Sequence, residues 1–151
     1  MAMLVDGDFT IGEDANLNPL TRSSGMIRNP SNPHNGLTSK SNWRQNQANG
    51  YTAGHMDEYI NEEDAAHYNS TILSHAFYLM ADNSKGSGLG LYVTSELFFD
   101  VITNYLNSNA NFYDFKDAFW LAADIRFGAG SSYIALIKSS FDQVGLYSPK
   151  K

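Results

Sequence analysis

The chain of 151 residues contains no cysteine, so neither a disulfide framework nor a thiolate zinc site can form in it. It also has no run of about 18 apolar residues, and we therefore expect no membrane span. Basic residues are few, with ten against sixteen acidic ones and no basic patch. The formal net charge of −6 would repel nucleic acid and anionic membranes, so neither is an expected partner.

The content of apolar side chains is that of a folded protein. Hydrophobic residues make up 42% and charged residues 17%, which is typical of globular rather than disordered sequences. A chain of this length buries roughly 70% of its unfolded surface, so we expect residues 1–151 to form a single domain. The first five residues are too short for a signal peptide, and we interpret them as a cytoplasmic N-terminus or a cloned boundary.

The two halves of the chain differ in composition. Residues 1–66 are rich in Asn, Gly and Ser, carry three of the four prolines and show no sustained apolar period. They predict a loop-rich segment with short turns. From Asn69 onward four segments have the period of a helix, and Pro149 is the only proline left. We therefore expect a mainly α fold, with a four-helix bundle over residues 67–147 that holds the core.

Apolar residues recur three and four positions apart in each of these four segments, which predicts amphipathic helices. Short turns between them favour packing as antiparallel neighbours. The expected boundaries are Asn69 or Ser70 to Asn83, about 89–106, a third helix closed by Gly128, and Ser131 or Ser132 to Gly145. The expected buried stripes are Ile72, Leu73, Ala76, Phe77 and Met80; Leu97, Phe98, Val101, Ile102 and Tyr105; Phe115, Ala118, Phe119, Ala122 and Ile125; and Ile134, Ile137, Phe141 and Val144.

The four histidines do not form a recognisable metal site. A zinc-protease signature needs two histidines one helical turn apart with a glutamate between them, because that spacing points both imidazoles at one metal. His67 and His75 are eight residues apart and separated by a helix start. A nucleophile elbow and a glycine-rich phosphate loop are also missing. From the residues alone, the chain lacks a self-sufficient catalytic apparatus.

Six short strings are nevertheless informative: residues 7–14 (GDFTIGED), 26–30 (MIRNP), 55–59 (HMDEY), 63–70 (EDAAHYNS), 75–79 (HAFYL) and 137–145 (IKSSFDQVG). They resemble, in the same order, strings of the thermolysin-like zinc metalloproteases of the M4 family. The string around His67 is similar to the family's E-D-N-G-G-V-H-x-N-S-G. The resemblance implies the C-terminal helical domain of a zinc metalloendopeptidase, with a peptide or protein substrate and an N-terminal catalytic lobe of the same parent as partners. It also implies secretion.

The resemblance assigns roles to four residues that composition alone would treat as solvated surface groups or core. His67 resembles the histidine that hydrogen-bonds to the oxyanion of the tetrahedral intermediate. Asp64 resembles the carboxylate that orients this histidine. Arg28 resembles the arginine that binds a main-chain carbonyl on the primed side of the substrate, and Ile27 resembles a wall of the adjoining apolar pocket.

Two kinds of metal ion follow from the same resemblance. The zinc ligands would lie before residue 1, so this chain would hold none of them and would be inactive alone. Asp8 and Glu13 match carboxylates of the family's calcium cluster, and carboxylate oxygen is the ligand that calcium prefers. Thr10 stands where a further acid is usual.

Departures from the family pattern support an alternative function. Between Asp64 and His67 the chain is two residues shorter than the family, with Ala65 and Ala66 where glycines are usual. Thr71 replaces a glycine, and residues 34–54 hold an insertion that includes Trp43 and Arg44. The domain could therefore be a non-catalytic remnant that acts as a peptide-binding or interaction module. An unrelated helical bundle with chance matches is a third reading.

Overall fold

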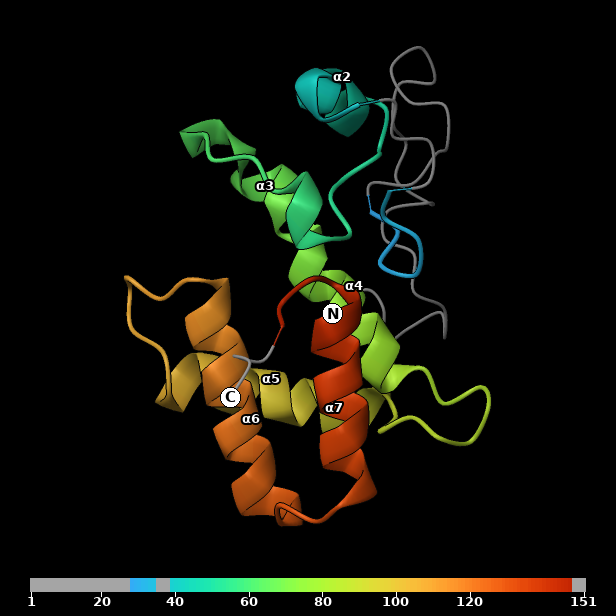
Figure 1. The fold of residues 1–151 in the computed structure, drawn as a ribbon, viewed down its shortest axis with the longest axis vertical. Coiled ribbons are helices and arrows are strands. Elements are labelled where there is room, and N and C mark those ends of the chain that lie inside the picture. The colour runs from blue at the N-terminus through green and yellow to red at the C-terminus, as the bar shows by residue number, and fades with distance from the viewer. Residues whose placement is uncertain (1–27, 35–38, 148–151) are drawn as a thin grey trace. The chain divides into compact units, whose positions relative to one another are not determined.

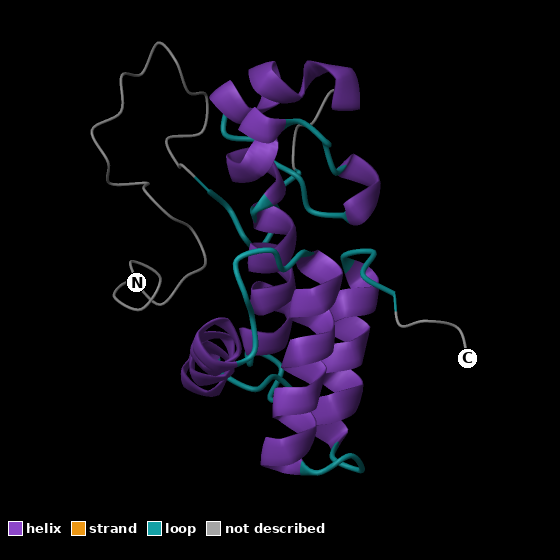
Figure 2. Ribbon diagram, turned by 90° about the vertical axis from the view of Figure 1, so that its left-hand side faces the viewer, coloured by secondary structure: helices purple, strands orange, loops and turns teal. Residues whose placement is uncertain are grey.

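A computed structural model of the chain describes residues 28–34 and 39–147, and the elements in these residues are all helices (Figures 1 and 2). The mainly α fold expected from the apolar period is confirmed. None of the described helices is long and apolar enough to cross a lipid bilayer. The chain divides into two compact units, Met1–Tyr78 and Leu79–Lys151. The division falls inside a helix rather than at residue 66, and a single domain over 1–151 remains a prediction.

The first unit joins short helices by ordered loops. Its core holds the side chains of Trp43, Ile60, Tyr68 and Ile72, each less than a tenth exposed. The composition predicted loops here, and it missed the helical turns, because each is too short to show an apolar period. The elements are η1 (Lys40–Asn42), α2 (Trp43–Ala48), η2 (Met56–Glu58), η3 (Glu63–Ala65), α3 (Ala66–Asn69) and the greater part of α4 (Thr71–Ala81).

The second unit contains α5 (Leu91–Asn104), α6 (Phe112–Phe127) and α7 (Ser132–Gln143). Asn111 caps α6 by accepting hydrogen bonds from the amides of Tyr113 and Asp114 at 2.8 and 3.1 Å. The helix ends at Gly128, whose φ of 82° is a conformation that glycine adopts at low cost. A short turn then leads into α7, so that α6 and α7 lie side by side and antiparallel (Figures 1 and 2).

An aromatic cluster forms the core of the second unit. The ring of Phe119 is fully buried and lies 5.0 Å from that of Phe98 and 5.5 Å from that of Phe141, between ring centroids. The predicted stripe of α7, from Ile134 to Val144, is buried throughout. Because α7 runs alongside α6 for its whole length, its apolar face is covered from end to end.

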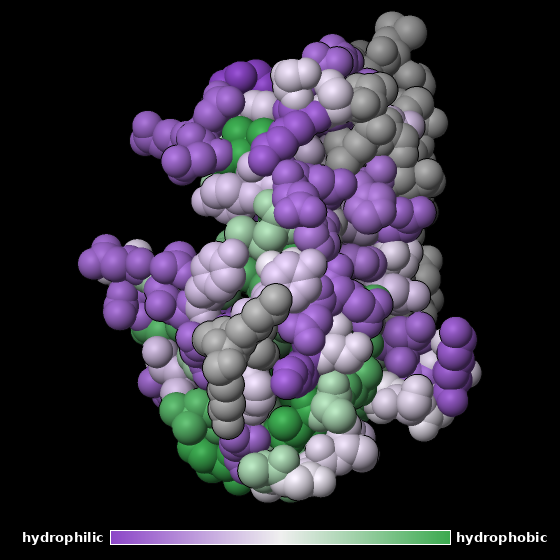
Figure 3. All heavy atoms as spheres, viewed as in Figure 1, coloured by the Kyte–Doolittle hydropathy of each residue, from purple (hydrophilic) through white to green (hydrophobic). Residues whose placement is uncertain are grey.

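The predicted stripes of α5 and α6 are partly wrong. Ile102 is 58% exposed and Ile125 is 69% exposed, although the periodicity placed both in the core. The physical reason lies in the packing direction, because α5 crosses the α6–α7 pair instead of running parallel to it (Figures 1 and 2). A crossing helix covers only the middle of a stripe. Apolar surface is accordingly visible over α6 in the space-filling view (Figure 3).

Candidate functional site

His67 lies on the surface of the first unit, in the single-turn helix α3. Its main-chain oxygen accepts two hydrogen bonds, one from Nη2 of Arg28 at 3.3 Å and one from Oγ of Ser70 at 3.0 Å. Within residues 28–34 and 39–147 its imidazole has no hydrogen-bond partner. Two hydrogen bonds thus hold the backbone at this position.

The residues that follow His67 anchor it to the core. Tyr68 is fully buried, and its main-chain oxygen accepts a bond from the amide of Ala53 at 3.2 Å. The Asn69 side chain accepts from the amide of Ile60 at 3.0 Å and donates to the oxygen of the same residue at 2.8 Å. Oγ1 of Thr71 donates to the oxygen of Ala53 at 2.7 Å. The amide and the carbonyl oxygen of Ile60 are thus both hydrogen-bonded. These bonds anchor the backbone on the C-terminal side of His67.

Asp64 lies in η3, three residues before His67, and its carboxylate binds Arg44. Nε of Arg44 donates to Oδ2 at 3.3 Å, and Nη2 lies 3.0 Å from Oδ2 and 3.2 Å from Oδ1. The same guanidinium binds Oε2 of Glu62 at 2.7 Å. In the described part of the chain, Asp64 makes no hydrogen bond to His67. An orienting contact between these two residues therefore remains a prediction from the resemblance.

Glu62 and the pair Trp43–Arg44 are site residues that the motif comparison did not single out. Glu62 stands five positions before His67, which is the separation between carboxylate and histidine in the family pattern when no deletion is assumed. Its side chain accepts a bond from Nε1 of Trp43 at 3.2 Å. An ungapped reading of the string would have found Glu62. The Arg44 contacts span 18 and 20 positions, and nothing local in the sequence signals them.

Arg28 begins the described segment that leads to the rest of the first unit. The next residues hold this segment in place, because Nδ1 of His75 lies 2.6 Å from the oxygen of Pro30 and the amide of Thr52 donates to the oxygen of Pro33 at 2.9 Å. The structure thus places the guanidinium of Arg28 beside the main chain of His67, and a shared role in binding substrate remains a prediction from the resemblance. The remaining predicted residues, Ile27, Asp8 and Glu13, lie outside the described residues.

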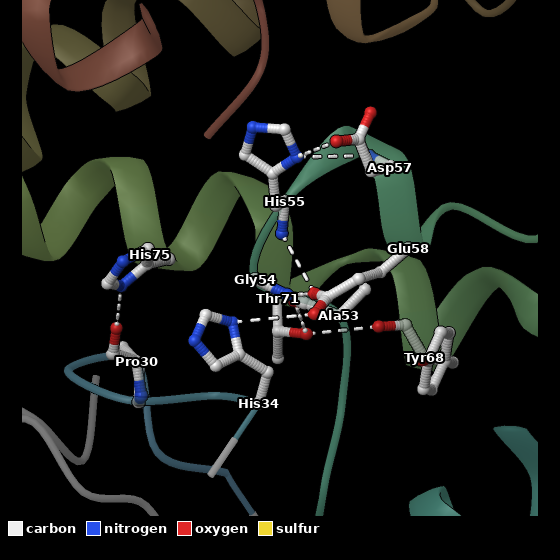
Figure 4. Close-up of polar contacts among 10 residues, drawn as sticks. All are labelled: Pro30, His34, Ala53, Gly54, His55, Asp57, Glu58, Tyr68, Thr71 and His75. Atoms are coloured by element: carbon white, nitrogen blue, oxygen red, sulfur yellow. Dashed lines mark hydrogen bonds and ion pairs between the residues drawn. The ribbon is translucent and has the colours of Figure 1, made fainter. Parts of the chain in front are cut away.

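A second polar cluster includes His34 of this segment (Figure 4). Glu58 accepts bonds from the amides of Gly54 and His55 at 2.6 and 3.1 Å, and its other oxygen lies 3.6 Å from Nδ1 of His34. A Cβ atom at Gly54 would come within 2.7 Å of Nδ1 of His34, so a glycine is required for this close approach. Burial lowers the pKa of His75, and nearby His34 lowers it further, against the opposing effect of the bond to Pro30.

These side chains do not form a metal site. In the part of the chain that the structure describes, no group of three or more His, Asp and Glu residues could hold a metal ion. The histidines of the second cluster bind backbone and carboxylate groups of the protein instead. The described residues thus do not bring three such ligands together around one ion.

Comparison with known proteins identifies the family. A model of the thermolysin metallopeptidase alpha-helical domain matches residues 3–146, and the chain belongs to this family. The resemblance inferred from the six strings is confirmed by this match. The fold is also that of the precursor of protealysin, a metalloproteinase from Serratia proteamaculans, with a TM-score of 0.68. That similarity covers 92% of this chain and 41% of the other, at 22% identity.

Relatives at the sequence level include bacterial proteases. A bacillolysin of Brevibacillus brevis is 26% identical over 152 residues, which cover 96% of this chain and 26% of the relative. Neutral protease B of Bacillus subtilis is 28% identical over 104 residues, covering 62% of this chain and 19% of the relative. The chain thus spans about a quarter or less of the length of these relatives. It corresponds to one domain of a longer enzyme in each of them.

Proposed function

We propose that this chain is the substrate-side half of a thermolysin-like zinc metalloendopeptidase. His67 hydrogen-bonds to the oxyanion that forms on the scissile carbonyl, and Arg28, with Ile27, binds the primed side of the peptide. The observation that carries the proposal is the bond between Arg28 Nη2 and the main-chain oxygen of His67, which joins residues 39 positions apart. The bond holds the partly buried Arg28 beside the exposed His67, which supports a shared role in binding substrate.

The chemistry of the two side chains suits these roles. An imidazole N–H aimed at a developing oxyanion stabilises the transition state more than the ground state, and this difference is what accelerates a reaction. A guanidinium has five N–H donors in a rigid plane, so a bond to a protein carbonyl is compatible with a second bond to a substrate carbonyl. His67 is exposed and rests on a fixed backbone, which is the preorganisation that such stabilisation needs.

Other parts of the proposal rest on the family. Zinc would be held by an N-terminal catalytic lobe of the parent enzyme and would activate the attacking water there. The parent would act on peptides or proteins outside the cell. Calcium, with Asp8 and Glu13 as ligands, would bind in the part of the chain that the structure does not describe. Because the family's zinc ligands would lie in the N-terminal lobe, the isolated chain would have no peptidase activity.

The contact between Asp64 and Arg44 favours the alternative that the domain is a non-catalytic peptide-binding module. Arg44 takes up the carboxylate that the family uses to orient the histidine. The two functions differ in a simple binding experiment with apolar peptides. A module would bind them on its own and retain this binding after His67→Ala, whereas a catalytic half would bind them weakly without its partner lobe.

The coding sequence upstream of this chain provides the first test. We expect a helix with the signature H-E-x-x-H, followed by a glutamate ligand, because that spacing binds zinc and leaves a position for water. A second test is to incubate the isolated chain with casein and excess zinc, where we expect no cleavage above the blank. A parent without the signature, or turnover by the chain alone, would contradict the proposed function.

A further inference from the structure

We propose that Trp43 and Arg44, at the start of α2, are positioning residues for His67. This inference rests on the proposed function, since it names the groups that hold the oxyanion-binding histidine in place. The two residues lie in the insertion that separates this chain from the family pattern. They act on both sides of His67, through the carboxylates before it and the aromatic ring after it.

Arg44 fixes the turn before His67. Its guanidinium reaches Oε2 of Glu62 at 2.7 Å and both oxygens of Asp64 at 3.0 and 3.2 Å. These hydrogen bonds, with that to Asp64 first, raise the pKa of Arg44 above its ordinary value. One planar group thus bridges the carboxylate of Glu62, which precedes η3, and that of Asp64, which lies within it. A network of this kind restricts the backbone more than isolated surface pairs do.

Trp43 fixes the residue after His67. Its ring is buried and lies 5.6 Å from the ring of Tyr68, between centroids. Its Nε1 donates to Oε1 of Glu62 at 3.2 Å, so the indole joins the core to the carboxylate network. The guanidinium of Arg44 stacks over the same indole, with Cζ 4.4 Å from the ring centroid. Trp43 and Arg44 therefore connect the carboxylates of Glu62 and Asp64 to the buried ring of Tyr68.

The contacts of Arg44 change how His67 would be positioned. In the family pattern a carboxylate before the histidine acts on its ring. Here Glu62 and Asp64 bind Arg44, and the histidine is placed through its backbone. The imidazole would then reach the oxyanion because the turn of residues 62–68 is rigid. Displacement of a catalytic group by about 1 Å can cost up to about 100-fold in rate. Contacts that hold the turn before His67 would therefore preserve the rate.

The test compares Arg44→Gln with Arg44→Lys and with a matched control, Arg126→Gln. Arg126 also forms an exposed ion pair, to Glu96 at 2.6 Å, but it lies in the second unit. In the full chain, hydrogen exchange is followed at the amides of Ala65 and Ser70, which donate to Glu62 and Ala66. We expect at least about tenfold faster exchange at both amides in Arg44→Gln and no change in Arg126→Gln.

Lysine should restore only part of the protection, because an ammonium group cannot bridge two carboxylates in one plane. Trp43→Phe is a second variant that keeps a ring against Tyr68 and removes the bond to Glu62. It should increase exchange at Ala65 and leave the fold intact. Unchanged exchange at Ala65 and Ser70 in Arg44→Gln would overturn the inference.

Steady-state kinetics of the enzyme that contains this chain separate positioning from mere stability. With Arg44→Gln we expect kcat to fall about tenfold with little change in KM, and Arg44→Lys to recover part of the loss. If His67→Ala lowers kcat and Arg44→Gln does not, the positioning role is wrong and the proposed function stands. If His67→Ala itself leaves kcat unchanged, the proposed function is wrong, and the exchange rates still decide whether Arg44 orders the turn.

Discussion

The guanidinium of Arg28 lies 3.3 Å from the main-chain oxygen of His67, between Nη2 and O. This bond ties the side chain of Arg28, which is partly buried, to the backbone of the turn that carries His67. If both residues bind the substrate, as we propose, they form one substrate-binding pair.

Arg28→Ala should weaken substrate binding in the enzyme that contains this chain. We expect KM to rise about tenfold with a smaller change in kcat, because a bond to a remote substrate carbonyl acts in the ground state and the transition state alike. Arg28→Lys should recover little, since a lysine does not reproduce the planar fork. Peptide hydrolysis is measured over a range of substrate concentrations. A fall in kcat at constant KM would argue against a binding role.

Asn69→Ala should destabilise the turn that carries His67. The amide and oxygen of Ile60 would lose their partners in a buried position, at a cost of about 2–3 kcal/mol in the free energy of unfolding. Asn104→Ala is a suitable control, because the Asn104 side chain is exposed and binds only Asp100 on the helix surface. Urea titrations should place the control within about 0.5 kcal/mol of the wild type. Equal losses in the two variants would contradict this reading.

The free energy of unfolding should fall on acidification, in part through His75. Burial lowers the pKa of this histidine in the folded chain, so the unfolded chain takes up the proton first as the pH drops below about 6.5. Stability is then lost from that pH downward and levels off below the lowered pKa. Urea titrations at pH 7.5 and 5.5 should show a smaller loss for His75→Gln than for the wild type. An equal loss in His75→Gln and in the wild type would contradict this assignment.

Phe119→Ala and Ile125→Ala test the division of α6 into a buried and an exposed part. Phe119 is fully buried within the aromatic cluster, and we expect a loss of about 3–5 kcal/mol on truncation. Ile125 is 69% exposed, and its truncation should change the free energy of unfolding by no more than about 0.5 kcal/mol. Thermal or urea unfolding measures both. A loss at Ile125 close to that at Phe119 would show that the surface over α6 is covered in solution.

The sequence predicted the long helices well, and the reason is local. The stripe from Ile134 to Val144 and the stops at Gly128 and Gly145 depend on neighbours within a few residues. The exposure of Ile102 and Ile125 was missed, since periodicity tells which residues share a face and not how far a partner helix extends along it. The crossing of α5 over α6 is a property of the packed unit.

The sequence predicted only part of the candidate site. His67 and Arg28 were identified through the family strings, which carry information that spacing in one chain does not. The binding of Asp64 by Arg44 could not be foreseen, because it joins residues 20 positions apart in segments without a shared motif. Physical contact across such a distance is set by the fold of the first unit. Glu62 is different, since its separation from His67 was visible in the sequence.

The most direct measurement is the kcat of His67→Ala in the proposed parent enzyme, in which this chain would follow a zinc-binding lobe. His34→Ala is the control, because it removes a second partly exposed histidine of the same unit. If His67 stabilises the oxyanion, kcat should fall by about 100- to 1000-fold in His67→Ala, with KM nearly constant and the control close to the wild type. A kcat within about twofold of the wild type would contradict the account.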